Sequence, residues 1–436
     1  MAPPHPPLVP NRIPMTLAPD TAMLTTAMLT TADGRPLKQA LVLAQSRARR
    51  RAFLLVVPLL AFVLISFVVP IIQMLHRSVY NDGLSANAPA LAVWLDANPL
   101  GTAPDEAAFA ALASDFKTMK ADKTAGLAGT RVNYTLSESR SLFTATARVA
   151  DSLAPPYKEA FLTINPKWGE PAVWVAMRAA SHAYTSDFYL TALDLERADD
   201  GSLRWVDDKG RIYIYLFVKT FILSGVITLA CLALAFPVAH LLATLPMAKS
   251  NLLMILVLLP FWTSLLVRTT SWIVLLQGQG VVNDLLVAAG VLTDDGRLSM
   301  MYNQTGTIIV MTHILLPFMI LPLYSVMRTI PPSYARAARS LGATSWSTFR
   351  RIYLPLTLPG IGAGALLVFI LAVGYYITPA LVGGADGQLI SNFIDFHMDK
   401  SNWSMAAALS AMLLAGVLVL YWLYDRLVGI DNLKLG

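Results

Sequence analysis

The stretch "YARAARSLGATSWSTFRRIYLPLTLPGI", residues 334–361, decides which fold the chain is expected to adopt. It carries four arginines and no acid, and it lies between two strongly apolar segments. Pro331 and Pro332 precede it and are expected to end the apolar helix before them, because proline lacks an N–H and clashes with the preceding turn. A short helix over 334–341 is then predicted, with Ser333 as its N-cap.

The residues after this short helix predict a turn into a second helix. Gly342 suits a left-handed helix end, and Thr344 or Ser345 is expected to cap a second helix that runs to Pro355. Because Ala338 and Gly342 are four residues apart, we expect them to share a face of small residues that another surface approaches closely. The plainer interpretation is a basic loop held at a membrane interface by its arginines.

The composition places this loop in a membrane protein. Of the 436 residues 56% are hydrophobic and 14% are charged, whereas soluble domains have about 25% charged residues. The mean hydropathy is +0.56, which is typical of a polytopic membrane protein. A single cysteine, Cys231, excludes a disulfide within the chain.

Six apolar segments are long enough to cross a hydrocarbon core of about 30 Å, which takes about 20 residues of helix. The expected fold class is therefore an all-α polytopic membrane protein. The predicted spans are 52–75, 213–245, 252–276, 306–327, 359–383 and 405–424. Five prolines within or near them are expected to mark kinks: Pro237, Pro260, Pro317, Pro322 and Pro379.

The charges between the spans predict the topology. All charged residues in the loops 246–251 and 328–351 are basic. The charged residues in the loops 277–305 and 384–404 are six aspartates, one arginine and one lysine. Basic loops stay on the cytoplasmic side. We therefore expect a bacterial inner-membrane protein with a cytoplasmic N-terminus, its first span flanked by Arg47, Arg49, Arg50 and Arg51.

Four regions are predicted along the chain. Residues 1–45 are expected to be a disordered tail because they are rich in proline and then in Thr/Ala/Met repeats. Residues 46–76 hold the first span with its basic flank, residues 77–212 form a large extracytoplasmic insertion, and residues 213–430 form the membrane core. The insertion either packs on the membrane helices or forms an independent ligand-binding module.

Helical spacing of apolar residues predicts helices within 105–123 and 139–153 of the insertion. A hairpin or turn is expected around Asp208, Lys209 and Gly210, leading into the second span.

Motifs for catalysis are missing from the sequence. It contains no P-loop, no H-E-x-x-H, no G-x-S-x-G and no Cys/His set at zinc spacing. The scattered His240 and His313 are interpreted as residues of the helix interior. We therefore expect no enzyme activity, no bound metal and no cofactor in this chain.

The opening stretch resembles the signature loop of the transmembrane subunits of binding-protein-dependent ABC importers. That loop runs Glu-Ala-Ala, three residues and Gly, then ends in Leu-Pro; here it reads Arg336-Ala337-Ala338, Gly342 and Leu354-Pro355. The resemblance implies a coupling helix at about 333–345 that docks on a cytoplasmic ATPase. The ATPase-coupling residues would be Arg336, Ala337, Ala338, Leu341 and Gly342.

One position departs from the family pattern. Arg336 stands where the family has Glu. At the third position of a helix capped by Ser333, Glu would complete a capping box, and Arg is expected to weaken the helix by about 0.5–1 kcal/mol.

Three further segments resemble the spermidine/putrescine group of these permeases: 259–272, 374–384 and Asn402-Trp403. The resemblance implies the six-helix type I (MetI-like) fold. The implied partners are two ATPase subunits that bind ATP and Mg²⁺, a second permease or a copy of this chain, a periplasmic substrate-binding protein and the bilayer, with no nucleic acid. The implied solute is putrescine or spermidine, or alternatively an opine, an aminophosphonate or ferric ion.

Five residues are candidates for the substrate path. Arg268 lies within a predicted span, where a charge is costly and is a functional candidate by default, although it equally suits a side chain that reaches the outer interface. Trp262, Trp272, Tyr375 and Tyr376 offer aromatic faces to a cationic amine, or form the aromatic belt of a membrane protein.

Two other classes of function stay open. A membrane sensor would continue into a signalling domain after the last span. A secondary transporter would require buried acids and internal repeats, and neither is evident in the sequence.

Overall fold

The computed structural model describes residues 37–98, 101–198, 202–208 and 210–428. The chain divides into two compact units between Ile71 and Ile72. Within the described residues, helices dominate and the regular strands are a single pair. Six helical segments are long and apolar enough to cross a membrane, so the predicted all-α fold class with six spans is confirmed.

The described part of the first unit, residues 37–71, belongs to one long helix that continues along the chain to Arg77. It runs from α1 (Leu37–Val63) through the π-helical η1 (Leu64–Val68) into α2 (Val69–Arg77), and the segment Ala48–Arg77 is its candidate span. Residues 37–45 were predicted to be disordered, and this is wrong, because "LKQALVLAQ" is made of good helix formers. The rest of the predicted tail lies outside the described residues.

The insertion between the first two spans is a set of short helices. Its described elements are α3 (Pro89–Ala97), α4 (Glu106–Ala121), α5 (Ala125–Asn133), α6 (Ser139–Arg148), η2 (Ala150–Ser152), α7 (Tyr157–Ile164), η3 (Pro166–Gly169), α8 (Pro171–Ser181) and α9 (Asp187–Ala192). The helix predicted within 105–123 is confirmed as α4, whose N–H of Ala108 donates to Asp105 Oδ1 at 2.9 Å. The helix predicted within 139–153 ends earlier, at Arg148.

A small hairpin precedes the second span, but not at the predicted position. Strands β1 (Leu195–Arg197) and β2 (Leu203–Trp205) pair antiparallel, so the hairpin lies before the predicted position. The predicted alternative, a turn around Asp208 to Gly210, is confirmed, because the N–H of Gly210 donates to the carbonyl of Asp207 at 2.7 Å. Buried Asp194 explains the difference: its carboxylate accepts the backbone N–H groups of residues 212–214 at 2.8–3.1 Å. These groups therefore start a helix instead of a second strand run. Lys209 lies outside the described residues.

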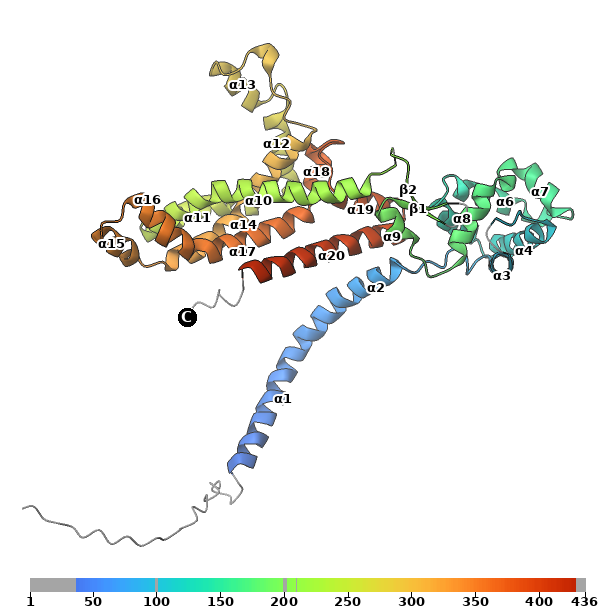
Figure 1. Ribbon diagram of the computed structural model, residues 1–436, viewed down its shortest axis with the longest axis horizontal. Coiled ribbons are helices and arrows are strands. Elements are labelled where there is room, and N and C mark those ends of the chain that lie inside the picture. The colour runs from blue at the N-terminus through green and yellow to red at the C-terminus, as the bar shows by residue number, and fades with distance from the viewer. Residues whose placement is uncertain (1–36, 99–100, 199–201, 209, 429–436) are drawn as a thin grey trace, which may run out of the picture. The chain divides into compact units, whose positions relative to one another are not determined.

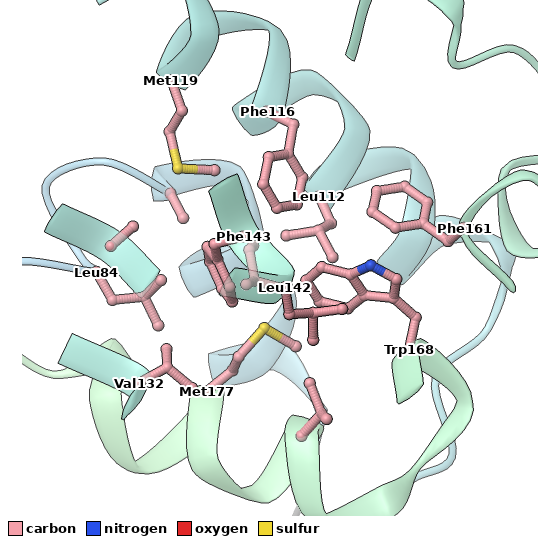
Figure 2. Packing of buried hydrophobic residues seen from close by; sticks show 14 of the residues in the cluster. Leu84, Leu112, Phe116, Met119, Val132, Leu142, Phe143, Phe161, Trp168 and Met177 are labelled. Carbon is pink, nitrogen blue, oxygen red and sulfur yellow. The ribbon is translucent and has the colours of Figure 1, made fainter. Parts of the chain in front are cut away.

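Aromatic side chains hold the insertion together. Trp168 is fully buried, and its ring meets Phe116 and Phe161 edge-on with centroids 5.6 and 5.3 Å apart (Figure 2). Its indole N–H donates to Thr146 Oγ1 at 3.0 Å, so the polar end of the ring is satisfied as burial requires. This core is separate from the cores of the membrane helices.

The insertion also packs against the bundle formed by the later spans. Phe188 and Ala192 of α9 share a buried cluster with Leu216 of the second span and Leu409 of the sixth. Asn81 Nδ2 donates to Ser404 Oγ at 2.9 Å. The insertion is thus attached at the start of the second and sixth spans.

The membrane core is built around three helices. These are α10 (Tyr213–Thr244), α14 (Gln304–Thr329) and α17 (Leu354–Val373), which lie side by side (Figure 1). They share one buried apolar cluster. A Cβ on Gly360 would lie 3.1 Å from the carbonyl oxygen of Pro322. The crossing of α14 and α17 therefore depends on a small residue, as is common between membrane helices.

Prolines do not interrupt all of these helices. Pro237 lies inside α10, and Pro317 and Pro322 lie inside α14. The sixth span is α20 (Trp403–Val428).

The third span differs from the prediction. Residues 252–276 are not one helix: α11 (Met247–Leu258) and the 3₁₀ turn η4 (Leu259–Trp262) end before α12 (Leu265–Leu276) begins. Pro260 has no N–H for an α-helical bond and its ring clashes with the carbonyl four residues earlier, so the helix stops there. The candidate span is instead Leu265–Ala288, made of α12 and α13 (Val281–Ala288), with η5 (Asp294–Gly296) after it.

The fifth span is also shifted. It was predicted over 359–383, whereas the helical segment runs over Ser345–Val373. It ends where Gly374 caps α17, and α18 (Ile377–Val382) and α19 (Ile390–Asp399) follow as separate short helices. Its start lies in the basic stretch itself, as α16 (Ser345–Thr348) and the π-helical η6 (Phe349–Tyr353).

The aromatic core gives a test of stability. Trp168→Ala removes the central ring of the insertion and is expected to lower its free energy of unfolding by about 3–5 kcal/mol. Pulse proteolysis across a urea series measures this value. Trp205→Ala, at a ring that is 55% exposed, is the matched control and is expected to cost far less. Equal losses for the two variants would contradict the assignment of the core.

Candidate functional site: the basic loop between the fourth and fifth spans

The loop is a short helix that ends in a defined turn. α15 (Pro332–Ser340) is followed by Gly342 at φ +87°. The N–H of Gly342 donates to the carbonyl of Arg339, and the N–H of Ala343 donates to the carbonyl of Ala338, both at 3.0 Å. These two bonds form a Schellman motif. The predicted left-handed helix end at Gly342 is confirmed.

The start of α15 corrects the prediction. Pro331 is the N-cap and Pro332 is the first helical residue, so Ser333 lies inside the helix and caps nothing. Proline suits this first position because its N–H would have no helical partner there. Arg336 is therefore the fifth helical residue, and the predicted loss of a capping box at Arg336 is wrong.

The second helix begins as expected. The Oγ1 of Thr344 accepts the N–H of Ser347 at 3.2 Å, so Thr344 is the N-cap. The helix does not stop at Pro355 but continues into the fifth span. The wider π turn η6 lies directly before Pro355, a common way for a long helix to accommodate a local irregularity.

The predicted coupling residues do not all face the same way. Ala338 is only 6% exposed, whereas Leu341 is 89% exposed, and a Cβ on Gly342 would meet no atom within 4 Å. Ala338 and Gly342 thus do not share an open face, because the left-handed turn directs the chain away after Leu341. Arg336, Ala337, Leu341 and Gly342 are exposed.

Aromatic contacts fix the loop to the second span. The ring of Phe349 lies 5.6 Å from Trp346, 5.9 Å from Phe236 and 6.2 Å from Tyr353, between centroids. Tyr353 hydroxyl and His240 Nδ1 are hydrogen-bonded at 2.8 Å. His240 was interpreted from sequence as a residue of the helix interior, and this is wrong, because it is exposed near the end of α10 and joins the loop to that helix.

This attachment lies far along α10 from the insertion. The insertion packs at Leu216 and the loop at His240. The 24 residues between them in the chain correspond to about 36 Å of helix, more than the thickness of the hydrocarbon core. Figure 1 shows α15 and α16 at the end of α10 opposite to α9.

The candidate path residues form one partial cluster. Trp272 Nε1 donates to His313 Nδ1 at 3.0 Å, and Arg268 lies within electrostatic reach of His313 and Tyr375. Arg268 makes a long contact of 3.5 Å to the carbonyl of Thr263, and its Nε is buried without a partner among the described residues. The structure thus brings Arg268, Trp272 and Tyr375 together and adds His313.

Two other candidates lie apart from this cluster. Trp262 is 78% exposed at the end of η4, and Tyr376 is exposed as well. The structure adds Ser391 and Asn392, whose side chains donate to the carbonyls of Tyr375 and Tyr376 at 2.5 and 2.8 Å. Their polar character within a mainly apolar sequence is the only signal that marks them.

Comparison with known proteins decides the family. The family model described as "Binding-protein-dependent transport system inner membrane component" matches residues 204–429. The chain belongs to this family. It is thus an inner-membrane subunit of a binding-protein-dependent transport system, and the basic loop lies inside the matched region. The insertion lies almost entirely before it.

Individual relatives show which group of permeases within the family the chain is similar to. The spermidine/putrescine transport system permease protein PotB of Escherichia coli (strain K12) is 38% identical over 221 residues, which cover 50% of this chain and 80% of PotB. The inner membrane ABC transporter permease protein YdcU of the same organism is 35% identical, over 44% of this chain and 65% of YdcU. The predicted resemblance to the polyamine group of permeases is therefore confirmed.

A solved bacterial alginate ABC transporter, in complex with alginate pentasaccharide-bound periplasmic protein, is 19% identical to this chain. The match covers 66% of this chain and 98% of the transporter chain, with a TM-score of 0.46. The score and the identity are too low for function to follow.

The turn of this family member gives a direct test. Gly342→Val places a β-branched residue in the left-handed region, which costs about 1–2 kcal/mol, although the added atoms meet open space. Amide hydrogen exchange over residues 338–348 is expected to accelerate about tenfold, since local opening then costs less. Gly342→Asn, which tolerates this conformation better, is the control. Unchanged exchange in Gly342→Val would contradict the Schellman turn.

Proposed function

We propose that this permease forms half of the translocation path of an ATP-driven importer. A separate pair of ATPase subunits binds ATP and Mg²⁺ and docks on the loop of α15 and α16. A second permease, related or identical, completes the path, and a periplasmic binding protein delivers the solute. The observation that best supports this proposal is the Schellman turn at Gly342, which leaves Leu341 exposed. This turn stands at the position of the family's coupling loop.

The proposed topology is supported by the distance between the two attachments on α10. The loop and the insertion attach about 36 Å apart along α10, so they lie on opposite sides of a bilayer that α10 crosses. The basic loop is then cytoplasmic by the positive-inside rule. The insertion and the six aspartates of the other loops are periplasmic, and the N-terminus is cytoplasmic.

The solute proposed first is a polyamine, on the strength of the relatives. PotB is named for spermidine and putrescine. Trp272 and Tyr375 supply aromatic faces that suit an amine.

A second candidate solute is anionic or zwitterionic, such as an aminophosphonate or an opine. The observation that favours it is Arg268, which no ion pair joins to an acid within the described residues. Uptake of labelled spermidine, with aminophosphonate and opine competitors, separates the two.

Leu341 tests the docking of the ATPase. Leu341→Asp places a charge on the most exposed apolar residue of the loop and is expected to reduce co-purification of the ATPase at least about tenfold, because a buried unpaired charge is costly. Solute-stimulated ATP hydrolysis by the assembled complex falls with it. The purified chain alone is expected to hydrolyse no ATP.

Leu203→Asp in the insertion is the control for Leu341→Asp, since Leu203 is also exposed and is expected on the opposite side of the membrane. Normal ATPase association for Leu341→Asp would refute docking through this turn. The buried Ala338 is a poor probe, because Ala338→Trp would disrupt the loop itself.

Reporter fusions test the topology. Fused near residue 150, a reporter that works only in the periplasm is expected to be active and one that works only in the cytoplasm to be inactive. Fused near residue 343, the two reporters are expected to give the opposite result. Alkaline phosphatase and a fluorescent protein form a suitable pair. Reversed signals would overturn the orientation, and equal signals at the two positions would overturn the placement of the loop and the insertion on opposite sides.

A further inference from the structure

A hollow with basic side chains in its lining lies behind the basic loop, between α15 and the ends of α10, α14 and η6. Its volume is about 810 Å³, within the size range of small-molecule sites. Arg328, Arg336 and Arg339 line it, together with His240 and Tyr353, and no Asp or Glu does. The hollow is separate from the exposed tip of the loop at Leu341, which does not line it.

The three arginines lack acidic partners within the described part of the chain. Arg328 donates to the carbonyl of Ala243 at 2.9 Å, and Arg339 makes only a long contact of 3.4 Å to the carbonyl of Ala335. Arg336 has no hydrogen bond or ion pair to another described residue. Three such cations around one concave surface create a positive potential that attracts anions.

Two neutral features point the same way. Thr348 is 94% buried and lines the hollow, yet its Oγ1 has no hydrogen-bond partner among the described residues. A buried hydroxyl without a partner is uncommon and calls for a ligand or water. Pro332, Tyr334 and Ala335 of the first turn of α15 also line the hollow, and this turn contains no acid. The positive end of the helix dipole therefore lies beside it and favours a negative charge.

We propose that this hollow binds a phosphate group. Its donors come from several elements: the guanidinium groups of Arg328, Arg336 and Arg339 and the hydroxyl of Thr348. A tetrahedral oxyanion offers oxygens to all of them, whereas a carboxylate offers two. Arginine also suits phosphate because its planar fork donates two parallel hydrogen bonds.

The site depends on Arg336, the residue that departs from the family's Glu. A glutamate at this position would replace one cation of the hollow by an anion and oppose phosphate binding. The phosphate comes either from the headgroup of an anionic phospholipid, since the hollow lies at the ends of helices long and apolar enough to cross a membrane, or from free phosphate in solution. Binding at this site does not require the transport function proposed above.

The experiment uses the purified full chain in dodecyl maltoside, without ATPase. One arm titrates inorganic phosphate by calorimetry, with chloride at equal ionic strength as the reference. The other arm measures by native mass spectrometry how much phosphatidylglycerol is retained compared with phosphatidylcholine. Binding of inorganic phosphate identifies a free-phosphate site, and selective retention of phosphatidylglycerol identifies a lipid site; either supports the proposal.

Variants locate the binding. Arg336→Glu and Arg339→Glu are each expected to weaken binding at least about tenfold, the scale of one charged hydrogen bond. Thr348→Val, which keeps the shape of a side chain whose hydroxyl has no described partner, is expected to weaken it about fivefold, the scale of one neutral hydrogen bond. Size-exclusion and thermal unfolding profiles check that each variant is folded.

Arg351→Glu is the matched control, because Arg351 is exposed on the same loop and does not line the hollow. Its binding is expected to stay within about twofold of that of the unmodified chain, since surface charges interact weakly through water. The proposal is overturned if neither probe binds. It is also overturned if Arg351→Glu weakens binding as much as Arg336→Glu, or if Arg336→Glu has no effect.

Discussion

Hydrocarbon offers no hydrogen-bond partner to a peptide group, so each backbone N–H and C=O at membrane depth must be satisfied within the protein. The helices of the core meet this demand along their length. Where a helix ends, side chains have to supply the hydrogen-bond partners of the backbone. Tyr375 and Tyr376, between α17 and α18, are non-helical, and the side chains of Ser391 and Asn392 donate hydrogen bonds to their carbonyls. The N–H of Ile390 donates a hydrogen bond to Thr220 Oγ1 at 2.9 Å. Polar residues of the core therefore act first as partners for irregular backbone.

The same demand explains why α10 organises the molecule. At its start, Asp194 accepts three backbone N–H groups and ties the helix to the insertion. Near its end, His240 bonds Tyr353 and the ring of Phe236 meets Phe349. A single helix thus carries the insertion at one end and the basic loop at the other. Under the proposed function, a displacement of the loop by an ATPase moves a helix that also carries the periplasmic surface, which is the rigid connection that coupling needs.

The sequence was sufficient for features with a local cause. Six apolar segments, the left-handed Gly342 and the cap at Thr344 each follow from a few adjacent residues. Features decided by distant contacts were missed. Ser333 is a good cap in isolation, but the preceding prolines already start the helix. Ala338 was expected to be open, and packing of α15 against the next helix buried it. The break at Pro260 was foreseen as a kink. The candidate path partners His313, Ser391 and Asn392 come from other helices, and their polar character alone does not say which residues they contact.

The distribution of charge constrains what this chain does alone. Arg268 lies among the candidate path residues and no described acid pairs with it. Two unit charges 4 Å apart repel by about 4 kcal/mol at an effective dielectric constant of 20. For a polyamine, which carries several positive charges, this is a barrier that aromatic faces worth about 1 kcal/mol each do not offset. A path built from two copies of this chain would contain Arg268 twice and therefore two positive charges. Under the proposed function, if the solute is a polyamine, the second permease has to supply carboxylates, and a related but different chain fits this requirement better than a copy of this one.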